Sequence, residues 1–470
     1  MEAAAAAQST PHIAMVPTPG MGHLISLTEF AKRLVRYHNF TVTFLIPHDG
    51  SSKKSQLSVL EGLPTSISHS FLPPTDMSNL PADTPIETRI ILTLTRSLTD
   101  LRESLRALAE STRLVALLVD LFGFPAFDLA AELGVPAYLF YSCNAMSLCS
   151  VFHIPKLDQM YTCEYRDLPE PVQFFPGCVP VQGIDMIDPV QNRQDDTYKL
   201  ALGVAKQYQR AAGLLVNSFL DLEPAAFKFL MQKGGEPPPV YPVGPLIRTG
   251  LESRSDLCLR WLDDQPNVSV LYVSFGSGGT LSLDQIRELA FGLEESGHRF
   301  VWVVKSPSED SKNATFFKEQ IADEPLWFLP EGFLERTKGL GMVVPSWAPQ
   351  VQILSHGSTG GFLSHCGWNS VLESIVNGVP IIAWPLFAEQ RLNAVELTTD
   401  LKVALRVQPN EDGVVERRQI SECIKRLMAS EEGKMLRERM TALRLAATTA
   451  FAEDGSSTKK ISELADIWNH

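Results

Sequence analysis

The stretch 346–390 gathers polar and aromatic residues of the kinds that bind a nucleotide. Within it, an apolar run stops at a Ser-His-Cys-Gly turn, 364–367, and apolar residues at helical spacing follow. This order predicts a strand, a tight turn and a helix that is capped by Asn369 or Ser370. His365 and the backbone N–H groups of such a helix start would together bind a phosphate or diphosphate.

The rest of this stretch offers partners for the other parts of a nucleotide sugar. Trp347 could present a ring face to a base, and the residues after it, 348–350, could present amide groups. Glu373 lies one turn into the predicted helix, where its carboxylate could accept hydrogen bonds from a ribose diol. Glu389 and Gln390 follow an apolar strand and suit a group rich in hydroxyls, such as a sugar.

Two titratable residues near the start of the chain could act as a base and its orienting partner. His23 ends a Pro-Gly-x-Gly-His turn after a short apolar strand, and Asp120 ends another strand. If both strands belong to one parallel sheet, the carboxylate could fix the imidazole tautomer while His23 accepts a proton from an alcohol or phenol. Taken singly, His23 fits a hydrogen-bonded turn residue better and Asp120 fits a helix cap, so the pair carries the hypothesis.

Alternating strands and helices predict how these residues are positioned. Two β-α-β openings, one near residue 12 and one near residue 268, each call for a parallel sheet with right-handed crossovers. The strands expected in the first half are 12–17, 41–46, 114–120, 136–141, 214–218 and 240–243, with one helix over 86–109. The segment 142–200 has Pro, Asp and Gln without clean periodicity, which favours a long loop.

The fold class is therefore α/β, with two doubly wound domains in tandem. We expect an N-terminal domain over 1–245, a linker over 246–256 and a C-terminal domain over 257–452. The linker has Gly, Pro, Arg and Ser without an apolar period. The tail, 453–470, is expected to join the first domain.

Composition excludes several classes of partner. The formal net charge of −13 argues against nucleic acid and anionic membranes, which are bound through excess Lys and Arg. No apolar run is long enough to span a bilayer, and the first residues lack a basic signal-peptide region, so a cytoplasmic protein is expected. The seven Cys form no C-x-x-C pair, and Cys366 beside His365 lacks a second pair of ligands, so no metal is expected.

The stretch 347–390 resembles the signature box of plant UDP-dependent glycosyltransferases of secondary metabolism. The resemblance rests on Trp347, Gln350, the His-Cys-Gly-Trp-Asn-Ser run 365–370, Glu373 and the closing Glu389-Gln390. It extends over essentially the whole chain, including Pro-Gly-x-Gly-His near the start. It implies two facing Rossmann-like domains of the GT-B type, with the acceptor bound mainly by the first and the donor mainly by the second.

The resemblance also implies a role for each matching residue. His23 would be the catalytic base and Asp120 its partner. Trp347 would stack on uracil and Ala348 meet it through the backbone, with Gln350 and Glu373 on the ribose. Diphosphate contacts would come from Ser277, His365, Asn369 and Ser370, and sugar contacts from Trp368, Glu389 and Gln390. Thr18 would reach the donor from the N-terminal domain. Gln390 is the family's usual choice for glucose. The implied reaction inverts the anomeric carbon of UDP-glucose, gives a β-glucoside and requires no cofactor and no metal.

The acceptor is the least defined part of this prediction. The Val-Asp-Leu-Phe-Gly run from Val119 is similar to the hydroquinone, or arbutin-synthase-like, subgroup, which implies a phenol, hydroquinone or hydroxyindole and a monomeric enzyme. Glu87, Phe122, Tyr141 and Ser142 are the candidate acceptor contacts, and Ser142 could instead hydrogen-bond the donor sugar. The Tyr-Ser-Cys-Asn run from Tyr141 departs from the family's usual Pro and Thr. Transfer to nitrogen, sulfur or a carboxylate, or a non-catalytic protein that binds nucleotide sugars, are the alternatives.

Overall fold

Two compact α/β units make up the chain. The computed structural model describes residues 10–51, 53–81, 84–232, 234, 237–249, 257–309, 312–313 and 326–470. Unit 1 comprises Met1–Ile184, Pro189–Arg248 and Thr449–His470, and unit 2 comprises Asp185–Asp188 and Thr249–Thr448. Most of the expected linker, 250–256, lies outside the described residues. The segment 185–188, which groups with unit 2, had no counterpart in the expected division.

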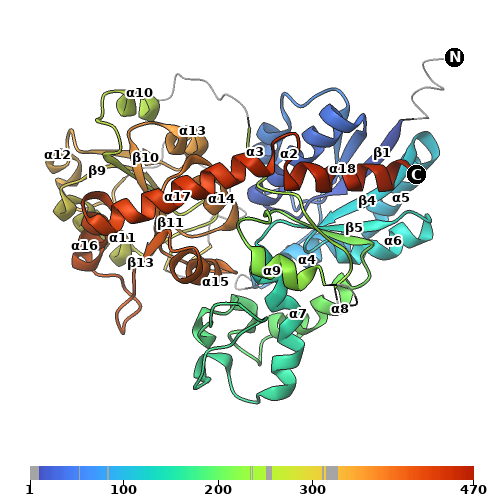
Figure 1. Ribbon diagram of the computed structural model, residues 1–470, viewed down its shortest axis with the longest axis horizontal. Coiled ribbons are helices and arrows are strands. Elements are labelled where there is room, and N and C mark those ends of the chain that lie inside the picture. The colour runs from blue at the N-terminus through green and yellow to red at the C-terminus, as the bar shows by residue number, and fades with distance from the viewer. Residues whose placement is uncertain are drawn as a thin grey trace. The chain divides into compact units, whose positions relative to one another are not determined.

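Unit 1 is built on a seven-stranded sheet in the order β3-β2-β1-β4-β5-β6-β7, with every pair parallel (Figure 1). The strands are β1 (Pro11–Val16), β2 (Thr41–Ile46), β3 (Ile67–Phe71), β4 (Arg113–Asp120), β5 (Ala137–Tyr141), β6 (Gly213–Val216) and β7 (Val240–Pro242). The helices are α2 (Met21–His38), α3 (Lys53–Leu60), α4 (Ile86–Arg96), α5 (Leu98–Ser111), α6 (Phe127–Glu132), α7 (Ala145–Met160), α8 (Asp196–Tyr208), α9 (Pro224–Leu230) and α18 (Ser456–Asn469). The order reverses between β1 and β4, where such sheets place their ligands.

Unit 2 has a six-stranded parallel sheet in the order β10-β9-β8-β11-β12-β13. The strands are β8 (Val270–Ser274), β9 (Arg299–Val304), β10 (Gly341–Pro345), β11 (Thr359–Ser364), β12 (Ile381–Ala383) and β13 (Ala404–Arg406). The helices are α10 (Leu257–Asp263), α11 (Leu283–Ser296), α12 (Phe333–Arg336), α13 (Gln350–Ser355), α14 (Trp368–Asn377), α15 (Gln390–Val395), α16 (Arg417–Ala429) and α17 (Glu431–Ala450). Its switch point lies between β8 and β11. The predicted pair of doubly wound α/β domains is confirmed.

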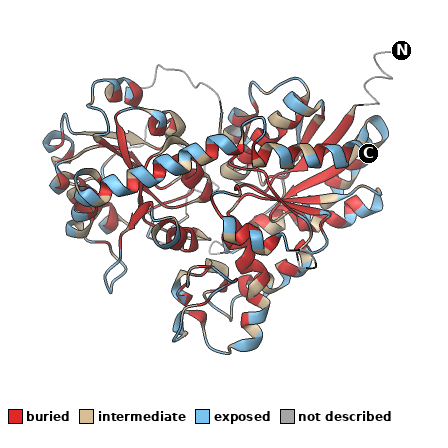
Figure 2. Cartoon of the chain, in the orientation of Figure 1, coloured by how far each residue is buried: buried red, intermediate tan, exposed pale blue. Residues whose placement is uncertain are grey.

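The apolar pattern explains why these elements pack as they do. In α2, Leu24, Leu27, Phe30, Ala31 and Leu34 recur at helical spacing, and all five are fully buried. Every residue of β1 is buried, as expected for a strand covered on both faces by helices. Figure 2 shows the central strands of both sheets buried and the outward helix faces exposed, while the edge strands β3 and β10 are more open to solvent.

The last helix closes the core of unit 1. Trp468 in α18 packs edge-on against Phe30, Phe40 and Tyr138, with ring centroids 5.2 to 6.4 Å apart. Ser457 at the start of the helix donates a 2.6 Å hydrogen bond to the carbonyl of Gly244. In the part of the chain that the structure describes, no helix is both long and apolar enough to cross a bilayer.

Two expectations for the first half of the chain were wrong. The single helix over 86–109 is two helices, α4 and α5, which break at Ser97. The segment 142–200 contains α7 and α8. Helix α7 is apolar on all sides and most of its residues are buried, so its sequence carries no one-sided helical period.

Candidate active site

His23 and Asp120 meet at the switch point of unit 1. Strands β1 and β4 are parallel neighbours, with Val16 level with Val119, so the segments that follow them start side by side. His23 lies in the first turn of α2, which begins at Met21, inside the Pro-Gly-x-Gly-His segment that the sequence indicated as a turn. Its Nδ1 is 2.6 Å from Oδ2 of Asp120, and Asp120 is completely buried. A proton on Nδ1 would face this carboxylate and would leave the Nε2 lone pair to accept another proton.

Ser142 is a third member of this cluster. Its hydroxyl lies 2.9 Å from Nδ1 of His23 and donates to Oδ1 of Asp120 at 3.1 Å. The same Oδ1 accepts a 2.8 Å hydrogen bond from the backbone N–H of Leu121. The sequence had assigned Ser142 to the acceptor or the donor sugar and missed this contact, because Ser142 follows β5, which pairs with β4 only in the folded sheet.

A buried carboxylate fixes the turn that carries Ser142. Glu223 accepts hydrogen bonds from the backbone N–H groups of Ala145 and Met146, at 2.9 and 2.7 Å, and so caps α7. Ser218 donates to the same carboxylate at 2.5 Å. The start of α7 is therefore held rigidly, which restrains the position of the Ser142 hydroxyl beside His23.

The other residues predicted in unit 1 are less directly connected to this cluster. Thr18 is buried just after β1, and its hydroxyl has no hydrogen-bond partner among the described residues. Glu87 lies in the first turn of α4, and Phe122 is half-buried after β4. Tyr141 is only 5% exposed, and its hydroxyl is 3.0 Å from that of Ser147, so little of its ring is accessible to an acceptor.

The switch point of unit 2 holds the glycine-rich turn and His365. Ser274 and Ser364 end β8 and β11 in register, which brings the following turns together. Gly276 has a positive φ of 73°, and a Cβ on it would lie 2.5 Å from the His365 ring. Only glycine fits this close approach, so the turn packs directly against the imidazole.

The start of α14 differs from the prediction in its cap. Gly367 is the N-cap and makes no side-chain cap, while Asn369 and Ser370 lie inside the first turn. A Cβ at Gly367 would meet Nε2 of His365 at 2.5 Å, so the ring occupies the place that a capping side chain would need. The helix start nevertheless presents backbone N–H groups beside His365, as an anion site requires.

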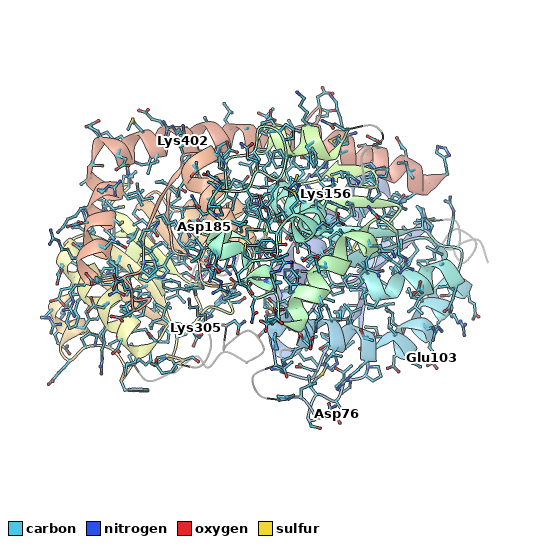
Figure 3. All side chains as sticks on the ribbon, turned by 90° about the horizontal axis from the view of Figure 1, so that it is seen from below. Asp76, Glu103, Lys156, Asp185, Lys305 and Lys402 are labelled. Atoms are coloured by element: carbon cyan, nitrogen blue, oxygen red, sulfur yellow. The ribbon has the colours of Figure 1, made fainter. Side chains whose placement is uncertain are left out.

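His365 is neutral in this setting, and Lys305 supplies positive charge nearby. Burial, and secondarily the charge of Lys305, lower the pKa of His365 to about 3. Lys305 follows β9, and its Nζ donates to the carbonyls of Gly276 and Ser277 at 2.6 Å each (labelled in Figure 3). The sequence analysis missed Lys305, although its place directly after a parallel strand was a signal of position.

The predicted ribose partners lie together. Gln350 Nε2 donates to Glu373 Oε2 at 2.7 Å and to the hydroxyl of Ser370 at 2.9 Å. Tyr272 donates to the Gln350 oxygen at 3.3 Å. Trp347 is 42% exposed, which leaves a ring face available for stacking, and Ala348 is buried behind it.

The predicted sugar end is more enclosed than expected. Gln390 is 3% exposed, and its oxygen accepts the backbone N–H groups of Leu386 and Phe387 at 2.9 and 3.0 Å. Trp368 is also 3% exposed. Glu389 is half-buried and accepts a 3.2 Å hydrogen bond from Asn393. Among the residues that the structure describes, no group of three His, Cys, Asp or Glu is arranged to hold a metal ion.

Comparisons with known proteins all point to UDP-sugar transferases. A family profile described as "UDP-glucoronosyl and UDP-glucosyl transferase" matches residues 258–428. The chain is 57% identical to the hydroquinone glucosyltransferase of Rauvolfia serpentina, covering 98% of this chain and 99% of the relative. It is 53% identical to UDP-glycosyltransferase 72B1 of Arabidopsis thaliana, covering 98% and 96%.

Solved structures give the same match. Phytolacca americana UGT2, in complex with UDP-2-fluoro-glucose and pterostilbene, is 50% identical with a TM-score of 0.90, covering 98% of this chain and 99% of that one. A Polygonum tinctorium UDP-glucosyltransferase capable of glucosylating indoxyl, in complex with 3,4-dichloroaniline, is 48% identical with a TM-score of 0.90 and the same coverage.

Proposed function

Because the chain belongs to the family of UDP-glucosyl and UDP-glucuronosyl transferases, we propose that it transfers glucose from UDP-glucose to a hydroxyl of a small aromatic acceptor. The transfer inverts the anomeric carbon and gives a β-glucoside. The observation that carries the proposal is the 2.6 Å contact between His23 and the buried Asp120. A protein that only binds nucleotide sugars has no use for an oriented base.

His23 handles the proton of the acceptor. Nε2 accepts the hydroxyl proton as the acceptor oxygen forms its bond to the anomeric carbon, and the bond from that carbon to the diphosphate oxygen breaks. Asp120 stabilises the imidazolium that results, and Ser142 steadies both side chains through its hydroxyl. UDP leaves with the electron pair of the broken bond.

The diphosphate end of unit 2 suits the charge that develops on UDP. Lys305 hydrogen-bonds the carbonyls of Gly276 and Ser277, and these peptide groups carry the N–H groups of Ser277 and Gly278. A cation on the carbonyl side polarises each peptide and strengthens its N–H as a donor. The start of α14 adds its own N–H groups. We therefore infer that transfer needs no divalent metal, so that EDTA leaves the rate unchanged.

Each part of the donor is assigned to its own group of residues. Trp347 would stack on uracil with Ala348 behind it, and Glu373 would accept ribose hydroxyls while Gln350 holds its carboxylate in place. Diphosphate contacts are assigned to Ser277, His365, Asn369 and Ser370, and Thr18 is assigned to the donor without a stated part of it. Sugar contacts are assigned to Glu389, Gln390 and Trp368.

The acceptor class rests on the relatives. The named relatives act on hydroquinone and indoxyl, and one holds pterostilbene. All three are aromatic hydroxyl compounds, so a phenol, hydroquinone or hydroxyindole is the proposed acceptor, with Glu87 and Phe122 among its contacts. The 3,4-dichloroaniline complex favours a second activity, transfer to an aromatic amine.

The test is release of UDP from UDP-glucose with hydroquinone, hydroxyindole, aniline, thiol and carboxylate acceptors. We expect the hydroxyl acceptors to react, with a β-anomeric proton coupling in the product. A preference for the amine over every hydroxyl compound would replace O-transfer by N-transfer, and absence of turnover with the whole panel would favour a binding protein. Size-exclusion chromatography and a fluorescent fusion in plant cells test the proposed monomer and cytoplasmic location.

A further inference from the structure

Four residues fasten one side of the predicted sugar-binding turn. The chain before and after Asp185–Asp188 belongs to unit 1, whereas these four residues group with unit 2. Asp185 (labelled in Figure 3) accepts a 2.6 Å hydrogen bond from Arg406, which ends β13. Asp188 is held at the other end of the segment. The segment is therefore attached to the sheet through Asp185 and to a different part of unit 2 through Asp188.

Asp188 makes three contacts with the turn that carries Glu389 and Gln390. Its backbone N–H donates to the carbonyl of Ala388 at 2.9 Å, and its carboxylate accepts the Ala388 N–H at 2.8 Å. Its other oxygen is 3.2 Å from Arg391. Asp188 thus binds both the N–H and the carbonyl of Ala388. Its carboxylate also pairs with Arg391, the residue after Gln390.

The turn needs external support because its backbone is strained. Ala388 has a φ of 58°, in the left-handed region that a residue with a Cβ adopts at a cost. Gln390 holds the preceding residues, 386 and 387, from within through its amide oxygen. Asp188 holds Ala388 and Arg391 from outside, so the two supports enclose the positions of Glu389 and Gln390.

The environment of Asp188 is that of a specific carboxylate site. Burial raises the pKa of Asp188, against the opposing effects of Arg391, the Ala388 N–H and Lys312. The effect of Lys312 on Asp188 is that of its charge. A partly buried carboxylate with this many partners is expensive to replace, unlike an exposed surface pair.

We propose that Asp188 is a positioning residue for recognition of the donor sugar, acting through the Ala388 turn on Glu389 and Gln390. This rests on the proposed function, which assigns those two residues to the sugar. Among the described residues, no hydrogen bond or ion pair joins Asp188 to the residues assigned to uracil and ribose. Removal of the Asp188 side chain therefore lowers the affinity for UDP-glucose and leaves the affinity for UDP unchanged.

The test compares Asp188→Ala and Asp188→Asn with Asp196→Asn, which alters an exposed carboxylate paired with Lys199. Calorimetry gives the affinities for UDP and UDP-glucose, and hydrogen exchange follows the peptide that contains Ala388. Asp188→Ala should lower the affinity for UDP-glucose roughly tenfold, while the affinity for UDP changes less than about twofold. The same variant should speed hydrogen exchange of the Ala388 backbone amide. Asp188→Asn, which keeps an oxygen for the Ala388 N–H, should fall between Asp188→Ala and wild type.

Each other outcome overturns the proposal. An equal loss of affinity for UDP and for UDP-glucose would show that Asp188 supports the stability of unit 2 in general. Faster exchange with unchanged UDP-glucose affinity would separate the turn from sugar recognition. If Asp188→Ala fails to fold, Asp188→Asn decides with the same two affinities. Failure of the proposed function is distinct, because it appears in the wild-type protein as an absence of turnover with UDP-glucose.

Discussion

The two switch points share a topology and differ in chemistry. In unit 1, the elements after β1 and β4 bring together an imidazole and a carboxylate, His23 and Asp120. In unit 2, the elements after β8 and β11 bring together a glycine turn and the neutral imidazole of His365. The parallel sheet supplies only a place where two chain segments meet. The residues placed there decide whether that place moves a proton or holds an anion.

The contrast between the two histidines follows from their neighbours. His23 faces a carboxylate, which would stabilise a proton gained in the proposed reaction. His365 is enclosed by glycines and lies near Lys305, and both burial and that charge oppose protonation. One histidine is arranged to change its charge, and the other is arranged to keep it.

The largest effect is expected for His23→Ala. Without a base to accept the hydroxyl proton, kcat should fall about 10³-fold, in the middle of the range for general base catalysis. The affinity for UDP should stay within about twofold, because His23 is not among the assigned donor contacts, which apart from Thr18 belong to unit 2. Steady-state kinetics and calorimetry give both numbers.

His69→Ala is the matched control, since His69 is an exposed histidine on β3 of the same unit. It should leave kcat unchanged. Transfer by His23→Ala at the wild-type rate would show that another group removes the proton.

In unit 2 the strongest effect is expected for Gly276→Ala. The new Cβ would lie 2.5 Å from the His365 ring at a residue whose φ is 73°, so the turn must shift. UDP affinity should fall roughly 10- to 100-fold, as overpacking of a close contact implies. Calorimetry with UDP measures it.

Gly297→Ala isolates the clash in this experiment. Gly297 also has a positive φ, 67°, but a Cβ there would meet nothing within 4 Å. Its alanine variant therefore introduces the backbone strain without the contact. Similar losses of UDP affinity in the two variants would attribute the effect to strain or stability and would remove the special role of the turn.

The sequence predicted the two switch points because each depends on local signals. Short apolar runs that end in Gly-rich turns identify parallel strands, and α/β sheets place functional side chains after such strands. This was enough to propose His23 and Asp120 as a pair, which the structure brings together. The joint assignment of Gln350 and Glu373 came from the family resemblance, and the two side chains are hydrogen-bonded. The fold class followed from the same alternation of strands and helices.

What the sequence did not predict depends on contacts between distant segments. Ser142 lies 119 positions from His23, and Asp188 lies 200 positions from Ala388. No periodicity connects such pairs. Helix α7 was hidden for a different reason, since a helix buried on all sides lacks the polar face that reveals helical spacing. The cap of α14 was misplaced because His365 fills the space in front of Gly367.

A smaller effect is expected for Lys305→Met, which tests the positive charge of the unit 2 site. Without the hydrogen bonds to the Gly276 and Ser277 carbonyls, UDP affinity should fall about tenfold, while uridine affinity stays unchanged. Lys338→Met, at an exposed lysine of the same unit, is the control. An equal loss for uridine would mean that Lys305 supports the unit as a whole and not the diphosphate end.

The smallest effect is expected for pH, which should leave the affinity for the donor nearly unchanged. UDP-glucose is the suitable ligand, since its diphosphate lacks the terminal phosphate proton that UDP exchanges near neutrality. Burial lowers the pKa of His365 to about 3, so this imidazole stays neutral from about pH 5.5 to about 8. UDP-glucose affinity should therefore change less than about twofold over that range.

Catalysis should respond to pH even though donor binding does not. His23 must be unprotonated to accept the acceptor's proton, so kcat/KM should fall as the pH is lowered. In His23→Ala this acid-side fall should disappear from the residual rate. Stronger UDP-glucose binding at low pH in the wild type would mean that His365 takes up a proton, and the division between a histidine that titrates and one that does not would be wrong.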